Sequence, residues 1–364
     1  MNNLKNKLKI GIVITGLGVG GAENHLLKIL PKLKVPVFVI SLTNLDQMGS
    51  FIENKGIKVY YLGLKKNLLN LPFVIHRFRK IIGKEKPSIL DSYLIHANIF
   101  TRLFGRIKSV NKIICSVRSD YSYMKVINFI DRLTKNKVDL FIPNSSSLVP
   151  YLKKNGVSEK KIKVLYNCID LNDLYSKVDS NYSLRKELNL SSDRIIILSV
   201  ARLQKVKCIE TSVKALSHLD KKFVLVLAGD GPQNFFLKNL AKERHLEDRV
   251  YFLGTRKDVP NLLNSSDIFI LSSEIEGMSN SLLEAMAMGK RCVVSNIPQN
   301  KELIKDEING LTFNLYDAVD CAKKIENIIG SNSYGIKAKQ NIIDNHDVNK
   351  IVEQYLKIIK DIVE

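Results

Sequence analysis

Short apolar runs rich in β-branched residues recur along this chain, and stretches with the period of a helix, such as 24–33 and 281–288, separate many of them. This alternation predicts parallel sheets with helices on both faces, because parallel strands are joined by crossovers that are usually helical. The runs that predict strands lie at 8–15, 37–42, 112–117, 140–143, 195–200, 223–228, 249–253, 268–271 and 292–295.

The second series of strand patterns starts near residue 194, after a polar stretch at 170–193. We therefore expect an α/β chain of two Rossmann-like, doubly wound domains, residues 1–172 and 173–345, which face each other across a cleft. The segment 346–364 contains an amphipathic helix, which we expect to pack back on the first domain.

Composition limits the class of protein further. The chain has 364 residues, of which 45% are hydrophobic and 25% charged, as in folded domains. No apolar run approaches the roughly 20 residues of a membrane-spanning helix. The basic N-terminus precedes a short apolar run that enters a glycine-rich loop, which favours a first strand over a signal peptide. The five cysteines are scattered without metal-ligand spacing, so we expect reduced thiols.

The charge is concentrated in one half of the chain. Residues 1–172 hold 29 Lys and Arg against 10 Asp and Glu, whereas residues 173–364 hold 27 against 26. Such a one-sided field indicates a polyanionic partner, namely an anionic membrane face, a lipid-linked phosphate or a nucleic acid. A general excess of surface lysine is the alternative explanation.

A glycine-rich loop at 16–21 follows the first predicted strand and precedes a helix. This arrangement lets a backbone turn approach a phosphate at the helix N-terminus. It matches the dinucleotide fingerprint, but the second strand ends in 41–44 without the carboxylate that would hold a ribose. An NAD-dependent Rossmann oxidoreductase therefore remains only an alternative, beside a mere tight turn.

In the second half, the strand at 195–200 is followed by Arg202 and Lys207. Open α/β sheets bind ligands at the carboxyl ends of their strands, so these cations could neutralise a diphosphate. Gly229 lies in a turn after the next strand. By itself such a cation pair is more often a solvated surface pair.

The strongest local signal is the segment 276–289. Ser281 to Glu284 reads as a capping box that starts a helix, so the loop 277–280 would direct backbone N–H groups at an anion. Glu276 and Glu284 would flank that anion. Glu284 could instead serve only to cap the helix.

Taken in order, these motifs resemble the retaining glycosyltransferases of family 4, which have the GT-B fold. The resemblance runs over nearly the whole chain, and ordered motifs at family-like spacing are together highly specific. It is carried by the segments 20–23, 144–145, 167–170, 229–232, 252–254 and 309–311, by Arg202 with Lys207, by Glu276 with Glu284, and by Glu302.

The resemblance implies roles for individual residues. Arg202, Lys207 and Glu276 are the implied catalytic residues: the two cations would stabilise the leaving diphosphate, and Glu276 would bind hydroxyls of the donor sugar. The family uses no metal, and retention fits an attack on the face from which the diphosphate leaves. The implied donor-binding residues, with a UDP-sugar as the expected donor, are Gly20, Gly21, Gly229, Arg256, Val259, Gly277, Met278, Ser279, Asn280, Ser281 and Glu284.

The chain departs from the family at a few positions. Cys168 and Cys208 stand where many relatives have glycine. Arg118 stands at about the place of a histidine near the donor sugar, and His96 resembles another family histidine. His96 and Arg118 are thus candidates for contacts with the acceptor or the sugar, although His96 could equally be a packed core residue.

Family members bind their acceptors on the N-terminal domain, which here is the basic half. The segment 65–84 reads as a basic amphipathic helix able to lie on an anionic bilayer, unless its apolar side packs into the core. We expect a peripheral enzyme on the inner face of the cell membrane that extends a lipid-linked or cell-surface polysaccharide, such as lipopolysaccharide or capsule. A basic nucleic-acid-binding protein is a further alternative, but the chain has no recognised motif for it and no Trp.

Overall fold

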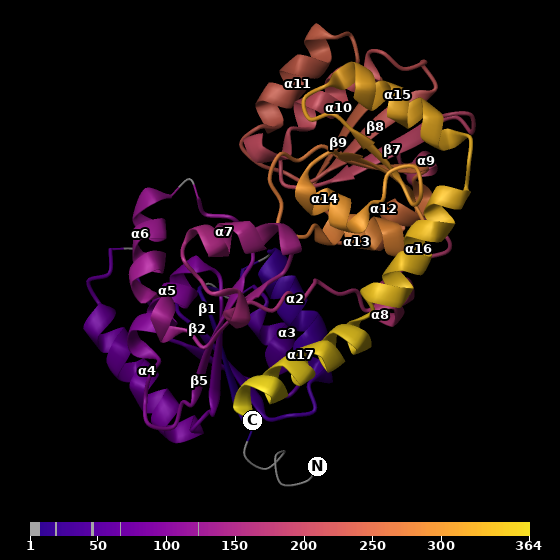
Figure 1. Ribbon diagram of the computed structural model, residues 1–364. Helices are drawn as coiled ribbons and strands as arrows, with labels where there is room; N and C mark the ends of the chain where they lie inside the picture. Colours follow the sequence, from indigo (N-terminus) through magenta and orange to yellow (C-terminus); the bar gives the residue numbers. More distant parts are fainter. Residues whose placement is uncertain (1–7, 19, 45–46, 66, 123) are drawn as a thin grey trace. The chain divides into compact units, whose positions relative to one another are not determined.

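The computed structural model in Figure 1 describes residues 8–18, 20–44, 47–65, 67–122 and 124–364. Val19 of the glycine-rich loop and Lys66 of the basic segment thus lie outside the described residues. The chain forms two compact units. The first comprises the residues up to Cys168 together with Val348–Glu364, and the second comprises Ile169–Asp347. The break falls slightly before the boundary expected at residue 172.

The first unit is built on a six-stranded parallel sheet in the order β3-β2-β1-β4-β5-β6. This is the Rossmann order, in which the strand sequence reverses between β1 and β4. Its elements are β1 Ile10–Ile14, α2 Gly21–Ile29, β2 Val37–Ser41, α3 Gly49–Glu53, β3 Lys58–Tyr61, α4 Leu71–Glu85, β4 Ile89–Tyr93, α5 Ile95–Phe104, β5 Lys112–Val117, α6 Lys125–Thr134, β6 Leu140–Pro143, α7 Val149–Lys154 and α17 Val348–Val363.

The second unit repeats this plan in the order β12-β11-β10-β7-β8-β9, which reverses between β7 and β10. Its strands pair in parallel, as those of the first unit do. Its elements are α8 Leu171–Ser176, α9 Leu184–Glu187, β7 Ile195–Val200, α10 Ile209–Leu216, β8 Phe223–Ala228, α11 Asn234–Glu243, β9 Val250–Gly254, α12 Val259–Ser265, β10 Ile268–Leu271, α13 Asn280–Ala287, β11 Arg291–Ser295, α14 Pro298–Leu303, β12 Leu311–Phe313, α15 Ala318–Ile329 and α16 Ser333–Asn345.

Alternation along β1 shows why its residues are apolar throughout. Ile10, Ile12 and Ile14 enter a core that α2 and α17 cover, whereas Val13 enters a second core with α4 and α5. Successive side chains of a strand point to opposite faces, so a strand covered on both sides must be apolar at every position. The two six-stranded sheets confirm the predicted α/β class of two Rossmann-like halves.

The C-terminal helix belongs to the core of the first unit. Val348, Ile351, Tyr355 and Ile359 are buried there with residues of β1 and α2. Figure 1 shows α17 in yellow beside α2 and α3, although these two helices are near the N-terminus and α17 is at the C-terminus. No helix in the described part of the chain is long and apolar enough to cross a bilayer.

The segment 65–84 was expected to offer an apolar face to a membrane. This is wrong, because most of the apolar side chains of that face pack into the core. Val74, Phe78 and Ile82 of α4 are buried in the second core, and Ile75 and Ile81 pack partly against it. The apolar stripe of this helix therefore stabilises the fold, while its basic residues face solvent. The alternative of a core-packing helix is the correct one.

Candidate functional site

The point in the second unit where the strand order reverses places two loops side by side. β7 and β10 are neighbours in the sheet, yet the chain leaves them toward opposite edges. Such switch points form the crevice in which open α/β sheets bind ligands. The loop after β7 contains Arg202 and Lys207, and the loop after β10 contains Glu276.

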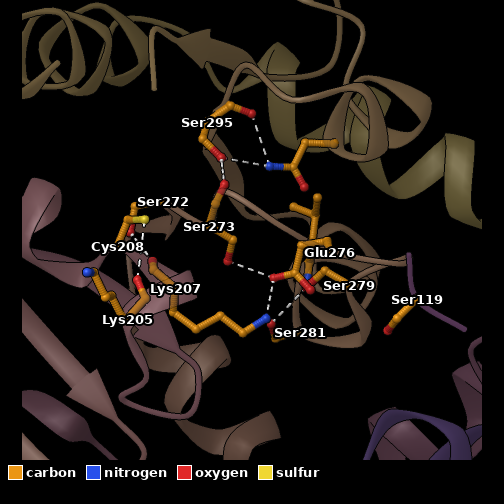
Figure 2. A network of polar contacts seen from close by, with 12 residues as sticks. Ser119, Lys205, Lys207, Cys208, Ser272, Ser273, Glu276, Ser279, Ser281 and Ser295 are labelled. Atoms are coloured by element: carbon orange, nitrogen blue, oxygen red, sulfur yellow. Dashed lines mark hydrogen bonds and ion pairs between the residues drawn. The ribbon is translucent and has the colours of Figure 1, made fainter. Parts of the chain in front are cut away.

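Lys207 and Glu276 meet at this crevice. The Lys207 Nζ lies 2.7 Å from Glu276 Oε1, and the two side chains are only 17% and 10% exposed. Ser273 donates its hydroxyl to the same carboxylate oxygen over 2.7 Å. Figure 2 shows the three side chains converging from the two loops. A cation and a hydrogen-bonding carboxylate are thus held together at one point.

Further polar contacts fix the two loops to each other. The Ser272 hydroxyl donates to the Lys207 carbonyl over 2.9 Å, and the Glu274 N–H donates to the Val206 carbonyl over 3.0 Å. Behind them, Ser295 donates to the Ser273 carbonyl, and the buried Asn300 donates to the Ser295 carbonyl over 3.0 Å. No sequence motif singled out these supporting residues, because they come from separate segments of the chain.

Gly229 allows the Arg202 loop to dock on the neighbouring turn. It has a φ of +145°, and a Cβ at this position would lie 1.9 Å from the Ala201 carbonyl oxygen. The Leu203 N–H donates to the Asp230 carbonyl over 2.9 Å, so the turn supports the backbone on both sides of Arg202. The Arg202 side chain itself is exposed. Gly229 therefore positions the loop through backbone contact.

The N-cap of α13 lies two residues before the one that the capping box predicted. Ser279 is the N-cap, because its backbone is extended and its hydroxyl accepts from the Leu282 N–H over 3.3 Å. Asn280 and Ser281 are thus the first helical residues, and Glu284 lies beyond the first turn. The expectation that Ser281 caps the helix is wrong, and Glu284 is not at the position where a capping box needs its acid.

The α13 N-terminus nevertheless adjoins the Lys207–Glu276 pair. Gly277 and the buried Met278 connect Glu276 to the cap. Backbone N–H groups in the first turn of a helix have no partner within the helix and favour an anion. Figure 2 shows Ser279 and Ser281 close to Glu276. The crevice thus combines cations with a helix N-terminus.

Arg256 lies in a separate ion-pair network. Its guanidinium contacts Asp258 over 2.6 Å and Glu187 over 2.6 Å. These carboxylates raise the pKa of Arg256, and the Arg256 guanidinium in turn holds the pKa values of Glu187 and Asp258 below their usual range. The network joins α9 to the start of α12, where Val259 is the first helical residue. The guanidinium therefore anchors this segment to its surroundings.

Cys208 shows how the chain makes a turn without glycine. Its φ is +47°, in the left-handed region that glycine prefers. Its thiol donates to the Lys205 carbonyl over 3.5 Å, and burial raises its pKa to about 11. All five cysteines are buried and free, as expected for reduced thiols. Cys168 lies in the other unit, 3.9 Å from the His25 ring.

In the first unit, the corresponding switch point lies between β1 and β4. At the end of the glycine-rich loop, Gly20 is the N-cap of α2 and Gly21 is the first residue of that helix. The Ala97 N–H donates to the Thr15 hydroxyl over 3.3 Å, which joins the start of α5 to the end of β1. His96 in that first turn is exposed. The alternative of a packed core histidine is thus wrong.

Arg118 belongs to a buried polar cluster at the end of β5. It donates to the Asn167 side-chain oxygen over 2.7 Å, and its guanidinium lies 4.9 Å from the centre of the Tyr93 ring. Beneath it, Asp91 accepts from Ser116 and from Tyr355 of α17, each over 2.9 Å. Burial raises the pKa of Asp91 to about 6. The C-terminal helix is thus joined to the sheet below Arg118.

Two family models match consecutive parts of the chain. "Glycosyltransferase Family 4" matches residues 19–173, and "Glycosyl transferases group 1" matches residues 181–361. Together they span nearly the whole sequence, with the division close to the boundary between the two units.

Relatives of known activity match across both units. The chain is 29% identical to the N-acetylgalactosamine-N,N'-diacetylbacillosaminyl-diphospho-undecaprenol 4-alpha-N-acetylgalactosaminyltransferase of Campylobacter jejuni, over 83% of this chain and 85% of that one. It is 26% identical to the UDP-Gal:alpha-D-GlcNAc-diphosphoundecaprenol alpha-1,3-galactosyltransferase of Escherichia coli, over 78% of each.

Solved structures share the fold. HepE of Anabaena, crystallised with UDP, matches with a TM-score of 0.87 at 20% identity, over 97% of this chain and 100% of that one. A glycosyltransferase of Rickettsia africae matches with a TM-score of 0.84 at 22% identity, over 99% of each. These likenesses confirm the GT-B fold.

We expect Gly229→Ala to destabilise the second unit by about 2 kcal/mol or more, because its Cβ would collide with the Ala201 carbonyl. Gly254→Ala is the matched control, since Gly254 also has a positive φ but has open space at the Cβ position. It should cost only about 1 kcal/mol. Urea unfolding followed by circular dichroism measures both, and equal losses would contradict a role for the close approach.

We expect the buried Asp91 to make stability depend on pH. Its folded pKa of about 6 lies above the ordinary value of 3.8, so its favourable contribution is complete below about pH 4 and is lost as the pH rises through about 6. Asp91→Asn removes this dependence. The unfolding free energy of the wild type relative to this variant should fall by up to about 3 kcal/mol between pH 4 and 7.

Urea unfolding across this pH range tests the role of Asp91, and the difference between the two proteins cancels other titrating groups. Tyr355→Phe removes one hydroxyl donor to Asp91 and should move the transition to higher pH. A difference that stays constant with pH would show that Asp91 titrates normally.

Proposed function

The chain belongs to the family 4 glycosyltransferases, and from this we propose that it transfers a sugar from a UDP-sugar to a lipid-linked or cell-surface glycan, with retention of anomeric configuration. The activity is that of a hexosyltransferase. Relatives named for transfer to undecaprenyl diphosphate-linked sugars support the acceptor, and the UDP complex of HepE supports the donor. The family match gives no support to an NAD-dependent oxidoreductase or a nucleic-acid-binding protein.

The observation that carries this proposal is the Lys207–Glu276 pair at the switch point of the second unit. Each side chain of this pair neutralises the charge of the other. We infer that the donor diphosphate forms an ion pair with Lys207 in place of Glu276. Glu276 can then accept hydrogen bonds from hydroxyls of the donor sugar. Arg202 and the α13 N-terminus add positive potential toward the same diphosphate.

In the proposed reaction the bond between the anomeric carbon and the diphosphate breaks, and the acceptor oxygen forms its bond to that carbon from the same face. The electron pair of the broken bond goes to the diphosphate, where Lys207 and Arg202 stabilise the charge. The leaving phosphate oxygen takes the acceptor proton. This route requires neither a side-chain base nor a metal ion.

The basic first unit supports a location on an anionic membrane, on its inner face, where lipid-linked acceptors are extended. His96 and Arg118, which follow β4 and β5, are the candidates for contact with the acceptor or the transferred sugar. Extension of a surface polysaccharide such as lipopolysaccharide or capsule is supported by a relative from Escherichia coli that is named for O-antigen biosynthesis and is 31% identical over 67% of this chain.

We expect UDP at a hundredfold excess over its Kd to raise the melting temperature by roughly 5 °C, because a ligand of the folded state stabilises it. Lys207→Ala should abolish this shift, because it removes the cation that meets the diphosphate. Lys205→Ala is the matched control, since it removes an exposed lysine of the same loop that is absent from the Lys207–Glu276 pair. A folded wild type that no nucleoside diphosphate stabilises would refute the donor site.

We expect the product to keep the anomeric configuration of the donor, which the coupling constant of the anomeric proton reports by NMR. The assay uses UDP-sugars with short-chain diphosphate-linked saccharides as acceptors. The initial rate should be the same with and without EDTA, because the proposed leaving-group stabilisation comes from Arg202 and Lys207. An inverted product would exclude the front-face route, and loss of activity in EDTA would exclude metal independence.

A further inference from the structure

An apolar ridge runs along the outer side of α6. Val126, Phe129 and Leu133 are 72%, 62% and 66% exposed, and their spacing of three and four residues places them on one side of the helix. Large apolar side chains gathered on one exposed helix face differ from the scattered ones that every surface has. The ridge belongs to the first unit, where α6 and α7 lie close to each other (Figure 1).

The acidic residue of α6 is turned away from this ridge. Asp131 is buried, contacts Arg102 over 2.7 Å, and accepts from the Tyr151 hydroxyl over 2.9 Å. The exposed charges that α6 contributes are Lys125 and Arg132. The outer side of the helix is therefore apolar and basic, without a carboxylate of its own.

A pocket of about 400 Å³ borders the ridge between α6 and α7. Lys125, Arg132 and Lys154 contribute three cations to its lining, and none of the described residues that line it is acidic. Asn155 holds Arg132 in place by accepting from its Nε over 3.3 Å. Phe129 lines the pocket and also belongs to the ridge, so the two features are continuous.

We propose that the ridge and the pocket together form a membrane-docking face, in which Val126, Phe129 and Leu133 enter the lipid and an anionic lipid phosphate binds among Lys125, Arg132 and Lys154. Apolar side chains beside cations match the two layers of an anionic bilayer surface, hydrocarbon below phosphate. A second copy of this chain would bring the same cations together, which repel. This inference rests on the membrane location proposed above and assigns it to one face.

The test is flotation of the full-length protein with vesicles of phosphatidylcholine, alone or mixed with phosphatidylglycerol. Phe129→Ser with Leu133→Ser should lower partitioning to the mixed vesicles at least about tenfold, because both side chains lose their burial in lipid. Lys125→Ala, Arg132→Ala and Lys154→Ala combined should lower it about a hundredfold, and only for vesicles that contain phosphatidylglycerol.

Matched controls separate this face from charge and apolar surface in general. Lys242→Ala, Lys323→Ala and Lys337→Ala remove three exposed lysines of the second unit and should leave partitioning within about threefold of the wild type. Leu69→Ser with Phe73→Ser removes two exposed apolar residues, one just before α4 and one in its first turn, and should also leave partitioning within about threefold of the wild type. Circular dichroism measures whether each variant is folded. If the Phe129 and Leu133 substitutions destabilise α6, the triple alanine variant of the three pocket cations still tests the proposal.

Each outcome supports or overturns the proposal. Reduced partitioning to the mixed vesicles in both the apolar and the charge variant of this face, with UDP-induced stabilisation unchanged, supports the proposal. Equal flotation of the wild type and the α6 variants overturns it, and loss in the α4 pair would then assign the contact to that segment. A wild type that does not float also overturns it, and the UDP measurement shows separately whether the transferase proposal stands.

Discussion

Parallel pairing of β7 with β10 is the constraint on which the candidate site depends. Because both strands end at the same edge while the chain departs toward opposite sides of the sheet, their two loops meet without a crossover between them. This brings together Lys207 and Glu276, which are 69 residues apart in sequence. In the first unit, β1 and β4 join the glycine-rich loop to the start of α5 in the same way.

The pairing of strands places the loops, and close backbone contacts then orient them. A side chain at Gly229 would separate the Arg202 loop from its neighbouring turn. The Ser273 hydroxyl holds Glu276, and Ser295 with Asn300 holds the Ser273 backbone. Two flexible side chains are thereby restricted before any ligand binds, so less conformational freedom remains to be lost on binding.

The sequence predicted the parts of the fold in which local pattern and burial agree. The fully apolar runs became strands, but β3, β4 and β12 were missed, since β4 carries the buried polar residues Asp91 and Ser92 and β12 has only three residues. Motifs indicated Lys207 and Glu276, but could not indicate their contact or the support from Ser295. The predicted N-cap of α13 was misplaced because Ser279 and Ser281 are both suitable N-cap residues, and only the backbone geometry distinguishes them.

Helices α4 and α6 show why an amphipathic pattern alone cannot locate a membrane surface. Both combine apolar and basic residues, and the pattern states only that some apolar face exists. In α4 the apolar face packs against the sheet, where Val74, Phe78 and Ile82 are buried. In α6 the inward positions include Asp131, which Arg102 requires as a partner, so Phe129 and Leu133 remain outside. An internal ion pair thus determines which face the helix offers to a partner, and that face lies in the half of the chain with the excess of positive charge.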